Sequence, residues 1–113
     1  MIEKILYDWL SEQLEDPVFM EEPENAPSRF YLLEKTGSSI ENHVCTSDFA
    51  LQSCAPSLFA AASMNQTGIS AMMDAAQLDD ITHVELNSDY NFTDTARKRH
   101  RYQAVLHITH YEE

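Results

Sequence analysis

The chain has 113 residues, enough for one domain with a buried core and too few for two. Its 19 acidic and 7 basic residues give a formal net charge of −12, which argues against a general nucleic-acid binder and against an anionic membrane surface as a partner. The hydrophobic fraction of 43% is typical of a folded chain, so we expect a single domain over residues 1–113.

The N-terminal segment has the pattern of an amphipathic helix. Apolar side chains recur at steps of three and four residues, acidic side chains lie opposite them, and Pro17 ends the pattern. Residues 18–20 are a short apolar run that we interpret as an edge strand, and residues 21–27, with two prolines, are interpreted as a loop. The apolar positions of this helix are Ile2, Ile5, Leu6, Trp9, Leu10 and Leu14.

A first β-hairpin is predicted after this loop. Residues 30–33 form a compact apolar run, and residues 42–53 are rich in β-forming side chains, with Phe49 and Leu51 on one face. Residues 34–39 lie between the two runs, and their glycine and serines predict the turn. We therefore expect two antiparallel strands joined there.

A second helix is predicted from Pro56, a residue that often takes the first helical position. Gly68 interrupts this helix at a cost of about 1 kcal/mol relative to alanine, so a kink or a close contact is expected there. Asp79 and Asp80 end the helix. Its helically spaced positions are Leu58, Ala61, Ala62, Asn65, Ile69, Met72, Met73 and Ala76.

A longer hairpin is predicted for the last third of the chain. Apolar and polar side chains alternate in residues 82–92 and again in residues 101–111, and residues 93–97 join the two runs. Such alternation is typical of strands with one buried and one wet face. The positions expected to share the buried face are Val84, Leu86, Tyr90 and Phe92 in the first strand and Tyr102, Ala104, Leu106 and Ile108 in the second.

These elements predict an α+β fold, with an antiparallel β-sheet of four to five strands and two helices packed on one face. Each helix has one apolar stripe and each long strand has one apolar face, and stacking the two layers buries both. We expect no signal peptide and no membrane-spanning segment, which indicates a soluble protein made in the cytoplasm.

No catalytic or metal-binding motif is apparent, so we expect neither an enzyme nor a cofactor. The histidines lack convergent spacing, and His107 and His110 are expected on opposite faces of one strand. Cys45 and Cys54 are also expected on opposite faces, without a disulfide. The chain has neither a Gly-x-Ser-x-Gly elbow nor a glycine-rich phosphate loop. The remaining histidines are His43, His83 and His100.

A basic cluster interrupts the acidic background at residues 97–101. It is compatible with a nucleic-acid patch, with a solvated strand end, or with a basic tip that meets an acidic surface on another copy. The charge balance favours the last interpretation. The candidate interface residues are Tyr90, Phe92, Arg97, Lys98, Arg99 and Arg101, and the candidate acidic partners are Glu12, Glu15, Asp16, Glu21, Glu22 and Glu24.

Several segments, spread over nearly the whole chain, resemble small tail proteins of siphophages and related prophages of Gram-positive bacteria. Among these proteins, the chain most resembles the tail terminator, or tail-to-head joining, group. The resemblance implies a subunit of a hexameric ring that caps the growing tail tube, ends its polymerisation and presents the surface that joins the head. The segments are residues 17–23 (PVFMEEP), 27–37 (PSRFYLLEKTG), 49–53 (FALQS), 86–94 (LNSDYNFTD) and 101–105 (RYQAV).

The resemblance also implies partners and a location. The partners are further copies of the chain in a homohexamer, the tail tube protein and the head-completion or connector protein, and the location is the virion tail after synthesis in the host cytoplasm. DNA would pass through the ring without specific binding, because acidic side chains in the lumen repel phosphates. The alternatives are a head-completion or adaptor protein, a small acidic module that binds a basic protein, and an enzyme with an unrecognised pocket.

Overall fold

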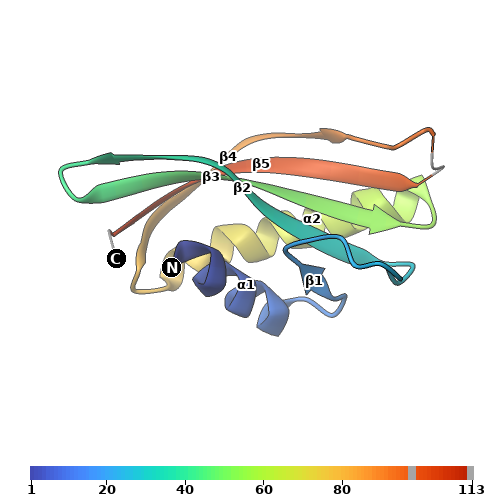
Figure 1. Cartoon of the computed structure of the whole chain (residues 1–113), viewed down its shortest axis with the longest axis horizontal. Coiled ribbons are helices and arrows are strands. Elements are labelled where there is room, and N and C mark those ends of the chain that lie inside the picture. The colour runs from blue at the N-terminus through green and yellow to red at the C-terminus, as the bar shows by residue number, and fades with distance from the viewer. Residues whose placement is uncertain (97–98, 112–113) are drawn as a thin grey trace.

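The structure, a computed structural model, describes residues 1–96 and 99–111. It is an elongated α+β domain of 44 × 24 × 23 Å, with one sheet and both helices on one face of that sheet (Figure 1). We call this helix-covered face the inner face and the opposite one the outer face. The elements are α1 (Ile2–Gln13), β1 (Val18–Phe19), β2 (Phe30–Glu41), β3 (Val44–Ala55), α2 (Leu58–Asp74), the 3-10 helix η1 (Ala75–Gln77), β4 (Ile81–Asn91) and β5 (His100–Tyr111).

The five strands lie in the order β1-β2-β3-β5-β4. The expected α+β class and the placement of the helices are confirmed, and the predicted edge strand exists as β1. The sheet is mixed rather than purely antiparallel, because β1 runs parallel to β2 while all other neighbours are antiparallel. Residues 20–29 return the chain to the start of β2, which makes this parallel pairing possible.

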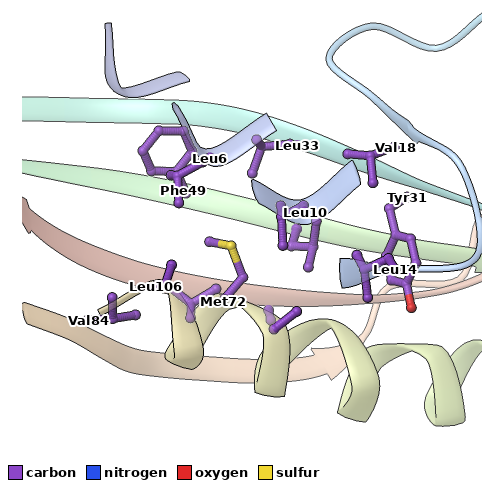
Figure 2. Packing of buried hydrophobic residues seen from close by; sticks show 14 of the residues in the cluster. Leu6, Leu10, Leu14, Val18, Tyr31, Leu33, Phe49, Met72, Val84 and Leu106 are labelled. Carbon is purple, nitrogen blue, oxygen red and sulfur yellow. The ribbon is translucent and has the colours of Figure 1, made fainter. Parts of the chain in front are cut away.

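The core lies between the inner face and the two helices. Leu6 and Leu10 of α1 lie against the sheet beside Leu33 and Phe49, with Met72 of α2 nearby (Figure 2). The two helices are also joined by a polar contact, in which Trp9 Nε1 donates a hydrogen bond to the carbonyl oxygen of Ala71 at 2.8 Å. Helix α1 is therefore held by both the sheet and α2.

Helix α2 packs closely against the sheet at Gly68. A Cβ atom on this residue would lie 2.8 Å from Leu51 Cδ2 and 3.1 Å from Tyr31 Cε1, so the expected close contact is confirmed and the helix continues through it. The prediction that Pro56 opens the helix is wrong by two residues. Ser57 is the N-cap, and its side chain accepts the N–H of Ala60, a role serine favours.

The predicted turn of the first hairpin is wrong. Strand β2 continues through residues 34–39, with a bulge between Lys35 and Gly37, and pairs with β3 as far as Glu41. The chain reverses instead at Asn42 and His43, whose φ angles are 52° and 67°. Two successive residues of positive φ make the tight turn that matches strand twist, and asparagine is one of the residues that tolerates it.

The second hairpin forms as predicted, but its first strand changes faces. Leu86 pairs with Leu106 and Ser88 pairs with Val105, so Asn87 is an extra residue in β4. A bulge of this kind reverses which side chains face inward beyond it. Val84 therefore faces the core while Tyr90 and Phe92 lie on the outer face, contrary to the expectation that all share the buried face.

Strand β5 has no such bulge opposite β3, and its predicted inner face is confirmed. Ala104, Leu106 and Ile108 are fully buried, and Tyr102 is partly buried against the core. The two cysteines are free, and the strand register places Cys45 on the inner face and Cys54 on the outer face, as expected.

Candidate interaction surfaces

The tip of the β4–β5 hairpin brings together four of the six predicted interface residues. Tyr90 and Phe92 meet edge to face with ring centroids 5.9 Å apart. The Arg101 guanidinium lies 4.7 Å from the centre of the Phe92 ring, and its Nε donates to the carbonyl oxygen of Phe92 at 2.7 Å. Arg99 follows in an antiparallel bridge with Asp94. Arg97 and Lys98 lie outside the described residues. We call residues 90–101 the basic tip.

Arg99 has partners within its own chain. Its Nη1 lies 2.8 Å from Glu22 Oε1, and its guanidinium carbon lies 5.6 Å from the centre of the Phe30 ring. Glu22 had been expected as an acidic partner on another copy. The ion pair joins the loop of residues 20–29 to the basic tip, and it covers the outer face at the start of β2. Burial under this cover raises the pKa of the Cys54 thiol to about 11.

Beside the basic tip, the outer face carries polar side chains in cross-strand pairs, together with the apolar side chains of Leu32, Ala50 and Val105. Gln52 Nε2 donates to Gln103 Oε1 at 3.0 Å, and the Gln103 amide in turn donates to the Tyr90 hydroxyl. Farther along, His107 Nδ1 contacts the Asp48 carboxylate. No helix covers this face (Figure 1), and the hydrogen bonds between strands hold these polar side chains in place there.

Figure 1 shows that the β2–β3 hairpin extends beyond the helices. A cleft opens there on the inner face, lined by residues of this hairpin, of the start of α1 and of β5. It has a volume of about 370 Å³, and we call it the hairpin cleft. At its rim Lys35 Nζ lies 3.3 Å from Glu3 Oε2. The pKa of Glu3 lies below its usual value, mainly because the carboxylate accepts a hydrogen bond from the residue's own backbone N–H. Lys35 lowers this pKa further, and burial acts in the opposite direction. The cleft is lined by Met1, Ile2, Glu3, Lys35, Ser38, Ile40, Cys45, Ser47 and His110.

The floor of the hairpin cleft contains a serine–histidine pair. Ser47 Oγ lies 2.8 Å from His110 Nε2, and His110 Nδ1 lies 3.1 Å from the carbonyl oxygen of Tyr111. The carbonyl can only accept, so Nδ1 carries a proton, and in the neutral imidazole Nε2 then accepts from the Ser47 hydroxyl. Such a pair is one part of an acyl-transfer site, but Ser47 is only 1% exposed, and the contact satisfies two buried polar groups.

The prediction that His107 and His110 face opposite sides of one strand is confirmed. His107 lies on the outer face and His110 on the inner face. Within residues 1–96 and 99–111, no three histidine, cysteine or carboxylate side chains converge on a point where a metal ion would fit. In the same part of the chain, neither helix has the length and hydropathy needed to cross a bilayer. The chain matches no protein-family model and no curated protein sequence.

Proposed function

We propose that this chain is a structural protein of a phage tail, and specifically the subunit of a homohexameric terminator ring. The ring caps the tail tube, ends its polymerisation and forms the surface that joins the head. The observation that carries the proposal is the one-sided covering of the sheet: the helices bury the inner face, and the outer face is left with ordered polar and aromatic side chains. The tail-protein resemblance of several segments supplies the class.

The basic tip is the proposed contact with an acidic partner, either a neighbouring copy or the tail tube protein. Arginine and aromatic side chains are enriched at the centres of protein interfaces. Arg101 is already fixed against Phe92, and Phe92 against Tyr90, so binding would order few side chains and lose little conformational entropy. Because the rest of the chain is strongly acidic, a second copy offers carboxylates in many directions.

The charge of the chain fits a ring through which DNA passes. A formal net charge of −12 per subunit repels phosphates, so a lumen lined by these side chains does not retain the genome. Contact between copies has to overcome the same repulsion, and the basic tip provides one place where opposite charges meet.

Two measurements test the proposal. Light scattering over a concentration series is expected to give a sixfold mass near physiological salt and a smaller mass in high salt. Purified chain added to polymerising tail tube protein is expected to bind tube ends and to stop elongation in electron micrographs. Tubes that neither bind the chain nor change in length would overturn the terminator function. Binding to portal complexes in place of tubes would indicate a head adaptor.

The contribution of the basic tip is tested by Arg97→Glu combined with Arg99→Glu. We expect this double charge reversal to abolish binding to the acidic partner, and we expect high salt to weaken the wild-type contact. Glu22→Gln is the matched control, because it removes the Arg99 ion pair within the chain without placing an acid at the tip. Unchanged assembly of the double variant on tail tubes and with other copies would contradict the assignment.

A further inference from the structure

Phe59 is exposed to an unusual degree. It is 85% exposed, more than any other large apolar side chain in the described residues, and its neighbour Leu58 is also exposed. Both lie in the first turn of α2, just after the end of β3. A phenylalanine left in water gives up the free energy that its burial would provide, and exposed aromatic anchors mark protein-binding sites.

The hairpin cleft lies at the opposite end of the molecule. Cys45, which lines the cleft, is near the start of β3, and Ala55 ends that strand just before Phe59. A strand of twelve residues spans roughly 36 Å. One chain therefore cannot place Phe59 in its own cleft, and only a second molecule can occupy it in this way.

The cleft is large enough for an aromatic side chain and has an apolar part. Its volume of about 370 Å³ is within the usual range of about 300–1,000 Å³ for sites that enclose a ligand group, and Ile2, Ile40 and Cys45 line it beside polar side chains. Ile40 at its rim is 62% exposed and would be covered by an occupant. An aromatic ring flanked by Leu58 matches these walls.

The charges do not oppose this contact. The first turn of α2 carries no acidic residue, and the helix dipole gives this end a partial positive charge, although Ser57 already caps the N–H of Ala60. At the rim of the cleft the carboxylate of Glu3 is paired with Lys35, so the charges of the cleft largely balance. In a chain with 19 acidic residues, a helix start without an acid is a surface that another copy can approach with little repulsion.

We propose that Phe59 of one copy docks in the hairpin cleft of the next copy. Each molecule then uses two different surfaces, one at each end, and such head-to-tail contacts close into rings or extend into filaments. This inference rests on the proposed function, because it requires that copies of the chain assemble. It adds to that function the contact that would join neighbouring subunits of the ring.

Two single variants and their mixture test this contact. Phe59→Ala removes the anchor and keeps the cleft, and Ile40→Asp places a charge in the cleft and keeps the anchor. Both positions are exposed, so circular dichroism and the melting temperature should stay close to those of the wild type. Truncating an interface anchor typically weakens association by about 30-fold or more. Each variant alone is expected to lose the ring in sedimentation velocity.

The equimolar mixture of the two variants gives the decisive result. Phe59 of the Ile40→Asp chain can still enter the intact cleft of the Phe59→Ala chain, so the mixture is expected to form dimers and nothing larger. A contact between two identical surfaces would give no such rescue. Met73→Ala, on the same helix, and Val44→Asp, on the same hairpin but facing outward, are matched controls that should assemble like the wild type.

Every outcome decides the docking contact. Rings formed by Phe59→Ala as readily as by the wild type, or a mixture without dimers, would overturn it while the ring function stands. A wild type that remains monomeric at every concentration would also overturn it. In that case the tail-tube elongation assay still decides the terminator function separately.

Discussion

At the start of β2, Phe30 points away from the helices and is nevertheless only 1% exposed, because Phe19 and Arg99 lie against it on the outer face. At the end of the same strand, Ile40 lies on the helix side of the sheet and is 62% exposed, because the helices do not reach so far. Burial along one strand is thus determined by what covers each position. The covered end of the sheet provides stability, and the bare end is free to bind.

The largest expected effect is the contrast between Phe30→Ala and Ile40→Ala. Emptying a filled aromatic site costs about 3–5 kcal/mol of unfolding free energy, whereas a truncation at the bare end should change it by about 0.5 kcal/mol or less. Urea denaturation of the two variants measures both values. Similar losses for the two variants would show that the ends of β2 do not differ in this way.

Gly68→Ala is expected to destabilise the covered end by about 1–2 kcal/mol. The added methyl group would clash with Leu51 and Tyr31, which costs about 1–3 kcal/mol, and the better helix propensity of alanine offsets about 1 kcal/mol of this. Ser70→Ala, exposed on the same helix, is the control and should be neutral or slightly stabilising. A Gly68→Ala protein that is more stable than the wild type in thermal denaturation would refute the close contact.

Tyr31→Phe is expected to cost about 1 kcal/mol, because the Tyr31 hydroxyl donates to the carbonyl oxygen of Met64 at 2.9 Å. Burial raises the pKa of Tyr31 from 10.0 to about 12, so the folded state holds the phenol proton more tightly than the unfolded state. This contribution is complete below pH 10.0 and is lost as the pH rises towards about 12. Denaturation across that range should show a steeper loss for the wild type than for Tyr31→Phe.

The smallest expected effect is that of Glu22→Gln. The Glu22–Arg99 ion pair is partly exposed, and such pairs contribute about 0.2–1 kcal/mol. The change in local opening should be clearer than the change in the free energy of global unfolding. We expect faster amide hydrogen exchange in residues 20–29 and unchanged exchange at the β2–β3 turn. Equal acceleration at both ends would mean that the ion pair does not act locally on the covered end.

Much of the fold was predictable because its signals are local. The three- and four-residue spacing of apolar side chains in α1, and the alternation of apolar and polar side chains in β5, each arise because one face of the element packs against the core. The turn of the first hairpin was mispredicted because Gly37 resembles a turn residue, whereas it lies in a strand next to a bulge. Strand β4 has two register shifts, between Ile81 and His83 and at Asn87, and the alternation of apolar and polar residues in the sequence reveals neither of them.

The candidate sites were predictable only in part. The basic tip stands out by charge, but the Arg99–Glu22 pair joins residues 77 positions apart, and no periodicity connects them. The hairpin cleft combines residues from α1, β2, β3 and β5, so it exists only once the sheet order is known. The Ser47–His110 pair was missed for the same reason.

Trp9 is the only tryptophan of the chain, and its indole is held against α2 by the hydrogen bond to Ala71. Its fluorescence therefore reports on one contact, the seating of α1 on α2. Release of α1 should shift the emission to longer wavelength as the indole meets water, even when the sheet remains folded. Helix α1 begins at the hairpin cleft, so the intrinsic fluorescence of Trp9 also reports on the helix that borders the proposed docking site.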